Sequence, residues 1–398
     1  MKQQFKILDT FLSDHQDYWR FEPFHQSLFD LLPWHDTHPE LCQWLINLLP
    51  KEIEHFKSEP AELVAQFQGF LPEVVAVNDI CNVEAAEVED LALPTGLDNG
   101  IPGRKLNQIV AMGSAAIGQH QGSEWLEWCS GKGFLGRILA HETQQPVTSF
   151  EFQQPLCERG QADADAMKLD MTFVQGDALS DTSRAVFNCN QHAVALHACG
   201  DLHVSLISKG VDAQLPAMTL SPCCYHLIQT ERYKPMSDVA KASCLSLTKA
   251  ELRIPLQETV TGGARVHRHR NLEMRFRLGL DLLLRETLGI SEYVPVPSIK
   301  KSQLDEGFEA FCLWAAEKKG FNLTGVDFQY YLEKAEARFW NMERLSLVQQ
   351  IFRRPLELWL ALDKSLYLEQ NGYQVSIKQF CSREVTPRNL LIHAEKTS

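Results

Sequence analysis

The chain has 398 residues, of which 44% are hydrophobic and 22% are charged, a composition typical of soluble globular proteins with two or three domains. No apolar run reaches the roughly 18 residues that a membrane span needs, and the polar, acidic N-terminus differs from a secretory signal, so we expect no membrane partner. The eleven cysteines do not form a disulfide framework in a chain of this length and predict free thiols in a reducing cytoplasm.

The net charge of −13 is concentrated at one end of the chain. Residues 1–100 contain 18 acidic and 5 basic side chains, whereas residues 101–398 contain 33 of each. We interpret the acidic part as a solvated helical domain. Because the rest of the chain is neutral, it can carry local basic patches, and a nucleic-acid partner is not excluded.

Helical patterns fill the acidic part. Apolar residues in PELCQWLINLL (39–49) recur at i, i+3, i+4 and i+7, and PAELVAQFQGFL (60–71) repeats the pattern after a proline at the helix start. The following acidic segment (83–103) is rich in proline and glycine at its end, as a linker is. A short helix is predicted directly after it, over residues 104–117.

Short apolar runs then alternate with helix-like segments or loops. The runs are EWLEWC (124–129), PVTSFEF (146–152), MTFVQGD (171–177), AVALHACG (193–200) and AMTLSPCC (217–224). This alternation predicts an α/β fold, with a parallel sheet that is covered by helices on both faces.

The last third of the chain loses that alternation and looks mainly helical before it ends in two strands, YQVSIKQF and NLLIHA. The helix before these strands is predicted to begin at Pro355 and to end before Gly372. We therefore divide the chain into an acidic helical domain (1–100), an α/β core (101–264), a mainly helical insertion (265–354) and the end of the core (355–398).

The segment EWCSGKGFLGRILA carries Gly131, Gly133 and Gly136 in the spacing G-x-G-x-x-G. A glycine-rich turn between a strand and a helix lets the backbone approach a ligand closely, and the helix offers free N–H groups. This pattern alone does not distinguish a dinucleotide from S-adenosylmethionine.

Carboxylates that follow three successive strands favour the methyl donor. Glu127 ends the first strand, where a carboxylate faces the positive end of the donor and would repel a pyrophosphate. Glu151 ends the second strand, where a ribose diol is held, and Asp177, with Ala178 beside it, follows the third and suits an adenine amino group. Each carboxylate alone is also compatible with a solvated loop. Their order, together with the terminal hairpin, disfavours an NAD-dependent oxidoreductase.

Four motifs together resemble a class I methyltransferase family. They are C-S-G-K-G-x-L-G (Cys129–Gly136), H-A-C-G-D (His197–Asp201), S-P-C-C-Y-H (Ser221–His226) and P-R-N (Pro387–Asn389). The family includes methyltransferase-like proteins and the glutathione S-transferase C-terminal domain-containing protein, and it is related to tRNA 2′-O-methyltransferases. The resemblance covers about residues 125–226 and 355–398. It implies a Rossmann-like fold with a C-terminal antiparallel hairpin and S-adenosylmethionine as the cofactor, but it does not imply the acceptor.

We assign the cofactor site to the residues at the ends of these strands: Glu127, Cys129, Gly131, Gly133, Glu151, Asp177, Ala178 and His197. The chain departs from many methyltransferases at Cys129 and Ser130, where those enzymes carry glycine and a small residue. A protein that keeps this fold but binds partners without catalysis is an alternative that intact carboxylates disfavour.

Four interpretations remain for the polar residues after the fourth and fifth strands. Asp201, His197 or His226 orients or deprotonates a hydroxyl or amine acceptor. Alternatively, Cys223 attacks a pyrimidine ring covalently. Zinc binding suits the residue types, but C-C and H-x-C lack the usual C-x₂-C spacing, so we assign no residue to a metal. In the fourth, the thiols only pack under the cofactor, and Tyr225 and His226 shape the acceptor pocket.

The insertion offers two further patterns. Five arginines between Arg265 and Arg277 grip phosphates or, alternatively, form a solvated face that pairs with the acidic N-terminal domain. Because of these arginines and of the resemblance, we favour RNA as the acceptor over a protein side chain. Aromatic and apolar residues at helical spacing between Phe328 and Met342 predict a core helix.

Overall fold

The computed structural model describes residues 1–89, 91–257 and 263–397. The chain divides into two compact units. The first comprises Met1–Gln16, Ala76–Val260 and Phe352–Ser398, and the second comprises Asp17–Val75 and Thr261–Ile351. None of the described helices is both long enough and apolar enough to cross a membrane.

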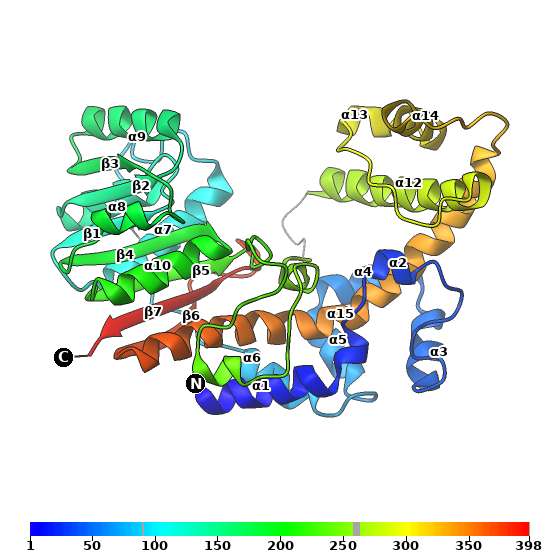
Figure 1. Ribbon diagram of the computed structural model, residues 1–398, viewed down its shortest axis with the longest axis horizontal. Coiled ribbons are helices and arrows are strands. Elements are labelled where there is room, and N and C mark those ends of the chain that lie inside the picture. Colours follow the sequence, from blue (N-terminus) through cyan, green and yellow to red (C-terminus); the bar gives the residue numbers. More distant parts are fainter. Residues whose placement is uncertain (90, 258–262, 398) are drawn as a thin grey trace. The chain divides into compact units, whose positions relative to one another are not determined.

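A seven-stranded sheet forms the centre of the first unit (Figure 1). Its strands are β1 (Glu124–Trp128), β2 (Val147–Glu151), β3 (Met171–Gln175), β4 (Gln191–Cys199), β5 (Ala217–Cys223), β6 (Tyr373–Gln379) and β7 (Leu390–Lys396). The order is β3-β2-β1-β4-β5-β7-β6. The first five strands in this order pair in parallel, and β7 pairs antiparallel with both β5 and β6. The predicted α/β fold, with a parallel sheet and a C-terminal antiparallel hairpin, is confirmed.

Helices cover both faces of the sheet. On one face lie α7 (Gly103–Ile117), α8 (Phe134–Thr143) and α9 (Gln154–Met167), whose apolar side chains share one core with β1 and β2. On the other face, Trp128 of β1 donates its indole N–H to the carbonyl of Leu202 in α10 (Asp201–Asp212), with 3.0 Å between N and O. Strands buried from both sides explain the continuous apolar runs of the sequence. The unit's short helices are α11 (Asp238–Lys241), η2 (Asp181–Val186) and η3 (Glu251–Leu256).

The helix expected to begin at Pro355 is longer than predicted. Helix α15 extends from Phe328 to Gln370, and Pro355 lies inside it. The proline removes one helical hydrogen bond, but its apolar neighbours Phe352, Leu356 and Trp359 are buried, and this packing favours continuing the helix. Its end agrees with the prediction, because Gly372, with φ of 83°, follows two residues later.

The N-terminal helix belongs to the first unit. The ring of Phe5 in α1 (Lys2–Asp14) lies 5.1 Å from that of Trp359, and the Trp359 indole N–H donates to Asp9 at 2.9 Å. The predicted domain limits differ here, because α1 packs on a helix more than 300 positions later in the chain.

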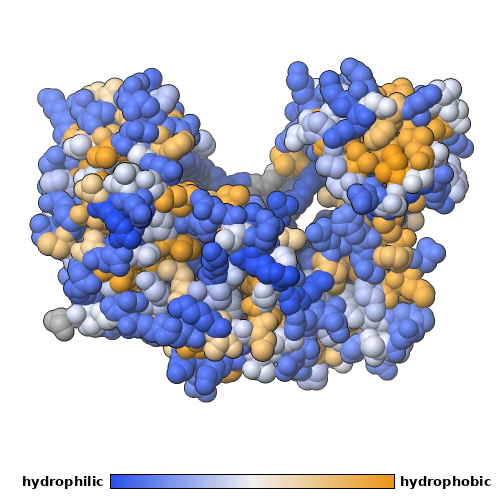
Figure 2. Space-filling model, viewed as in Figure 1, coloured by the Kyte–Doolittle hydropathy of each residue, from blue (hydrophilic) through white to orange (hydrophobic). Residues whose placement is uncertain are grey.

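The second unit is helical. Its helices are α2 (Pro23–Gln26), α3 (Pro39–Asn47), α4 (Pro50–Ser58), α5 (Pro60–Phe67), α12 (Ala264–Leu288), α13 (Lys301–Leu304), α14 (Phe308–Lys319) and the first half of α15. Two short helices contain the residues at which one unit changes to the other, namely η1 (Gln16–Tyr18) and α6 (Val74–Cys81). Buried Arg338 of α15 pairs with Asp281 of α12 at 2.8 Å and also donates to the Phe24 carbonyl. The acidic helices and the predicted insertion therefore form one body. Hydrophobic residues gather on its visible face between α12 and α14 (Figure 2).

Three histidines form a chain: His192 and His393 are buried in the sheet, and His120 is half-buried before β1. His120 Nδ1 lies 3.2 Å from His192 Nδ1, His192 Nε2 lies 2.8 Å from Thr219 Oγ1, and the same hydroxyl lies 2.8 Å from His393 Nδ1. Burial lowers the pKa of all three imidazoles, well below its ordinary value for His192 and to about 4 for His393. The fold therefore holds these rings neutral.

This chain of neutral rings predicts an acid-sensitive fold. The pKa of His393 is about 4 in the folded protein and about 6.5 when unfolded, so between these pH values the unfolded state binds more protons. The free energy of unfolding should therefore fall as pH decreases from 6.5 towards 4, by about 1.4 kcal/mol per pH unit for this residue. Urea unfolding followed by tryptophan fluorescence should show a shallower fall in His393→Asn, whose side chain still reaches Thr219. Equal slopes in the two proteins would contradict this.

Candidate functional site

The glycine loop after β1 turns through left-handed backbone. Cys129, Gly131 and Gly133 have φ of 57°, 60° and 70°, and the Ser130 N–H donates to the Phe150 carbonyl of β2 at 3.0 Å. A Cβ at Gly133 would collide with the Phe173 ring, whereas one at Gly131 would meet no atom within 4 Å. The loop therefore packs closely on the sheet at Gly133 and is open at Gly131.

Glu127 lies beneath this loop. Its carboxylate is buried, accepts a hydrogen bond from Ser149 Oγ at 2.8 Å and faces the backbone N–H groups of Leu135 and Gly136 in α8. Burial raises the pKa of Glu127 to about 7. The structure thus places this carboxylate against the first turn of α8, and contact with the positive end of a cofactor stays a prediction.

Glu151, at the end of β2, joins the loop to the next strand. Its Oε2 accepts from the Gly131 N–H at 2.9 Å, and its Oε1 accepts from the Gln153 N–H at 3.0 Å. The carboxylate is 7% exposed. It therefore orients the open position of the glycine loop, in addition to the predicted contact with a ribose.

Asp177 is the exposed carboxylate of the three. Its Oδ1 accepts from the Leu179 N–H at 2.9 Å, and its other oxygen has no partner among the described residues. The next residue, Ala178, is buried, and its carbonyl accepts from Lys209 Nζ and Ser205 Oγ at 2.8 and 2.7 Å. These bonds from α10 hold the backbone of this turn, so the Asp177 side chain is available to a ligand.

Strand β4 is irregular where it reaches the edge of the sheet. Between Leu196 and Cys199 the pairing with β5 shifts by one residue, and His197 within this bulge has φ of 68°. Bulges re-aim side chains near binding sites. Here the bulge places His197 with its Nε2 3.1 Å from Gln108 Oε1 of α7 and its Nδ1 3.9 Å from Cys223 Sγ.

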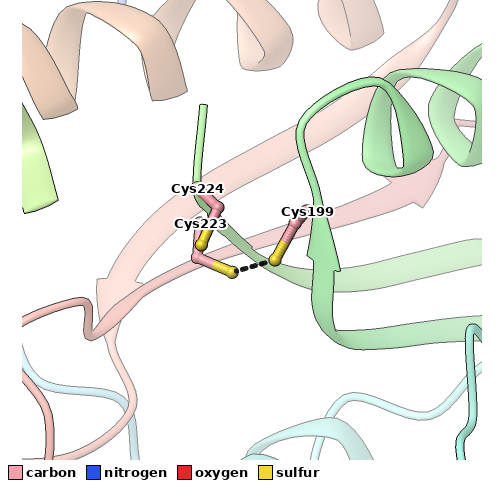
Figure 3. Close-up of side chains that lie close together, drawn as sticks. All are labelled: Cys199, Cys223 and Cys224. Atoms are coloured by element: carbon pink, nitrogen blue, oxygen red, sulfur yellow. Dashed lines mark hydrogen bonds between the residues drawn. The ribbon is translucent and has the colours of Figure 1, made fainter. Parts of the chain in front are cut away.

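Three cysteines meet at the ends of β4 and β5. The sulfurs of Cys199 and Cys223 lie 3.1 Å apart, and those of Cys199, Cys223 and Cys224 all lie within 4.8 Å of one another (Figure 3). Hydrogen bonds from the other two thiols lower the pKa of Cys224, while the pKa of Cys223 is raised by its hydrogen bonds with its two neighbours. Sequence spacing could not reveal this cluster, because Cys199 and Cys223 are cross-strand neighbours.

Asp201 and His226 lie beyond the cluster. Asp201 Oδ2 accepts from the Gln229 N–H at 2.7 Å, and its own N–H donates to the Leu227 carbonyl at 3.0 Å. His226 is partly buried, its Nδ1 has no partner among the described residues, and burial, followed by the nearby charge of Arg253, lowers its pKa. Asp201 thus holds the loop that carries His226, whose Nδ1 is buried without a partner among the described residues.

Sequence reasoning missed two residues that shape this region. Gln108, on α7, orients His197. Asp363, on α15, is fully buried and accepts from the Tyr233 hydroxyl and from the backbone N–H groups of Met236 and Ser237, so it anchors the long loop after β5. Neither lies near a motif, and no local signal marks them.

The arginines of α12 are largely engaged within the second unit. Three ion pairs join Arg268 to Asp305, Arg275 to Glu336 and Arg277 to Glu273. These partners are not in residues 1–100, so the interpretation that this face pairs with the acidic N-terminal part is wrong for these three. Arg265 and Arg270 are exposed and have no ion-pair partner among the described residues. The predicted core helix from Phe328 is also present, with Tyr331, Phe339 and Met342 buried.

Residues 104–231 match the family model of a methyltransferase domain. The match includes the glycine loop, the carboxylates after β1, β2 and β3, and the cluster at the ends of β4 and β5. This segment is a methyltransferase domain of the Rossmann-like class, and its cofactor is S-adenosylmethionine.

Solved methyltransferase structures show a weak similarity. The Pyrococcus abyssi tRNA (uracil-54, C5)-methyltransferase in complex with S-adenosyl-L-homocysteine is 19% identical over 29% of this chain and 28% of that chain, with a TM-score of 0.25. The 23S rRNA methyltransferase ErmE is 14% identical over 51% and 96%, with a TM-score of 0.24. Coclaurine N-methyltransferase bound to N-methylheliamine and S-adenosylhomocysteine is 12% identical over 90% and 99%, with a TM-score of 0.28.

These similarities support no argument about function, since each TM-score is below 0.5. The chain also spans less than a third of the length of the tRNA methyltransferase. The identification of the domain therefore depends on the family match and on the sheet topology.

The residues present fit this cofactor. Gly131 leaves open space in the glycine loop, and the buried Ser130 hydroxyl in the same loop has no partner among the described residues. Asp177 adds an exposed carboxylate with an unused oxygen after β3, which is separated from β1 by β2. A concave backbone, an unpaired hydroxyl and a free carboxylate are what a polar nucleoside with an amino acid tail requires.

Replacement of Asp177 should weaken cofactor binding. Loss of a hydrogen bond from a charged group costs about 1.5–3 kcal/mol, so Asp177→Ala should raise the Kd for S-adenosylhomocysteine roughly 10-fold or more. The matched control is Asp170→Ala, which removes an exposed carboxylate at the opposite end of β3. Isothermal titration calorimetry decides the matter: equal affinities for the two variants would exclude Asp177 from the cofactor site.

Proposed function

We propose that this chain is an S-adenosylmethionine-dependent methyltransferase of the cytoplasm that transfers a methyl group to an oxygen or nitrogen atom of RNA. The observation that carries the proposal is that the open glycine loop, Asp177 and His226 each follow a parallel strand, and so lie along the same carboxyl edge of the sheet. Ligands of open α/β sheets bind at this edge. All eleven cysteines are free, which supports a reducing compartment.

The cofactor, when bound, supplies an electrophilic methyl group next to a positively charged sulfur. Gly131, Asp177 and Glu151 would hold it, with Cys129, Gly133, Ala178 and Glu127 shaping the surrounding backbone. The protein's remaining task is to orient an acceptor lone pair and to remove a proton, since alignment of the reacting groups and general base catalysis are the two contributions that a methyl acceptor needs.

His226 is the residue that we assign to proton removal. A general base must be unprotonated at the working pH and must have a free lone pair. The lowered pKa of His226 keeps the imidazole neutral at pH 7, and its Nδ1 has no partner among the described residues. Asp201 acts through the loop that it holds, by way of Gln229 and Leu227, and is therefore a positioning residue.

Covalent attack by Cys223 finds less support. The nucleophile of such a reaction is the thiolate, and the pKa of Cys223 is raised by its hydrogen bonds to neighbouring thiols and by burial. His197 is likewise engaged with Gln108 through Nε2. Transfer to an oxygen or nitrogen atom with His226 as the base therefore fits the charge states better than methylation of a pyrimidine carbon.

RNA as the acceptor is supported by Arg265 and Arg270. Both guanidinium groups are exposed at the beginning of α12, and neither has an ion-pair partner among the described residues. Paired arginines contribute little to phosphate binding, whereas two unpaired ones each release counterions on contact with a polynucleotide. A protein side chain is the alternative acceptor.

Loss of the base should slow transfer without loss of the cofactor. We expect His226→Gln to lower kcat by about 10²–10⁴-fold, as for other general bases, while calorimetry shows unchanged binding of S-adenosylhomocysteine. In the unmodified protein kcat should fall as the pH drops through the lowered pKa of His226, because the protonated ring cannot accept a proton. This acid limb should be absent in His226→Gln. A retained limb with unchanged kcat would remove His226 from the mechanism.

The acceptor class is tested with methyl-labelled S-adenosylmethionine and a lysate from cells that lack the protein. Nuclease, and not protease, should release the macromolecular label. The double variant Arg265→Gln, Arg270→Gln should bind the recovered RNA with a salt slope smaller by about 2, given about 0.9 per phosphate contact. Lys318→Gln with Lys319→Gln, exposed residues at the end of α14, changes the charge equally and should leave the slope unchanged. Release by protease would establish a protein acceptor instead.

A further inference from the structure

The three thiols at the ends of β4 and β5 form a preformed set of soft ligands. Cys199 and Cys223 are paired positions on adjacent parallel strands, and Cys224 is the next residue. Their sulfurs lie within 4.8 Å of one another, and those of Cys199 and Cys223 are 3.1 Å apart. Zn–S bonds of about 2.3 Å place tetrahedral sulfurs about 3.8 Å apart, within this range. Thiolates select zinc and other soft metal ions over the hard ions Mg²⁺ and Ca²⁺.

A fourth ligand lies beside the cluster. His197 Nδ1 is 3.9 Å from Cys223 Sγ, and its Nε2 is 3.1 Å from Gln108 Oε1. An amide oxygen can only accept, so the proton resides on Nε2, and the unprotonated Nδ1 is the nitrogen that lies beside Cys223 Sγ. Metal-binding histidines are oriented in this way, with the second ring nitrogen donating to a carbonyl or carboxylate oxygen.

The backbone is strained where these ligands are presented. His197 has φ of 68° and Cys224 has φ of 44°, and each left-handed non-glycine residue costs about 1–2 kcal/mol. Such conformations persist where the surroundings determine them and cluster at ligand sites. Cys224 is one of the three thiols, and the bulge in β4 brings His197 beside Cys223.

The surrounding charge is suited to an anionic complex. Three thiolates, one neutral imidazole and Zn²⁺ have a net charge of −1. Arg388 lies near enough to act electrostatically on both Cys224 and His197, and Lys105 acts on His197. The two cations offset that charge, and Arg388 comes from the P-R-N motif, for which methyl transfer offers no assignment.

We propose that Cys199, Cys223, Cys224 and His197 form a tetrahedral Cys₃His site for Zn²⁺. On binding, each thiol that is still protonated loses its proton to solvent as its Zn–S bond forms, and no electron is transferred. Four protein ligands leave no open position, so the ion is structural. It joins the bulge of β4 to the end of β5 and fixes the backbone from which Asp201 and His226 extend. The site does not depend on the proposed methyl transfer.

The experiment uses full-length protein that is purified under reducing conditions, stripped with a chelator and titrated with Zn²⁺ or Co²⁺. The unmodified protein should bind one Zn²⁺ per chain, and Co²⁺ should give the intense visible bands of a tetrahedral thiolate complex. Cys199→Ser should lose both. The control, Cys189→Ser with Cys244→Ser, replaces two exposed cysteines and should retain both.

A milder variant keeps the test decisive if Cys199→Ser does not fold. Gln108→Ala leaves every ligand in place and should weaken Zn²⁺ affinity about 10- to 100-fold, as loss of a partner that orients a metal-binding histidine does. Absence of Zn²⁺ binding in the folded unmodified protein, an octahedral Co²⁺ spectrum, or a Cys199–Cys223 disulfide in place of metal would overturn the proposal. Binding of S-adenosylhomocysteine, measured separately, reports on the methyltransferase function alone.

Discussion

The reversal of the backbone at the carboxyl edge of the sheet is the constraint on which the site depends. After β1 and β5, and within the bulge of β4, a non-glycine residue takes left-handed φ: Cys129, Cys224 and His197. At about 1–2 kcal/mol each, these turns persist because the packing around them is tight. Gly133 and Gly200 lie at neighbouring turns where a Cβ would collide with Phe173 and with the Leu227 carbonyl. The edge is therefore rigid, and its side chains have fixed directions.

The charged groups along this edge have two different tasks: some hold the glycine loop in place, and others have an atom without a partner. Glu127 and Glu151 are buried and are bonded to backbone N–H groups or to Ser149, so they hold the glycine loop. Asp177 is exposed and keeps an unused oxygen, and His226 is neutral with a free nitrogen. The carboxylates nearest the loop thus determine geometry, while Asp177, farther along the edge, remains available to a ligand.

The α/β fold was predictable because each strand has a recognisable pattern in its own short stretch of sequence. Runs such as MTFVQGD and NLLIHA are short, apolar and bounded by turn residues, and the confirmed sheet follows from them. The first and last residues of the helices and of the two units were not predictable, since they depend on contacts between residues that are distant in the sequence. Pro355 lies inside α15 because buried residues on both sides favour the helix, and α1 joins the first unit through Trp359. No local pattern contains this information.

The site was predictable to the same degree. Carboxylates at strand ends, such as Glu151 and Asp177, could be located by their order in the sequence. Their partners could not be predicted, because Gly131, which follows β1, donates to Glu151 at the end of the adjacent β2. The thiol cluster could not be predicted for the same reason. The cysteine spacing within one segment disfavours a metal site, whereas the pairing of β4 with β5 brings Cys199 next to Cys223.

The strand order has a consequence for how the chain is made. Strand β7 lies between β5 and β6. More than 160 residues separate the end of β5 from the start of β7. Until residues 390–396 leave the ribosome, β5 remains an unpaired edge strand. All of its residues are buried in the folded protein, and such an edge pairs readily with strands of other chains. The nascent protein must therefore carry an unfinished sheet while those residues are made, and loss of residues 390–396 would leave that sheet incomplete.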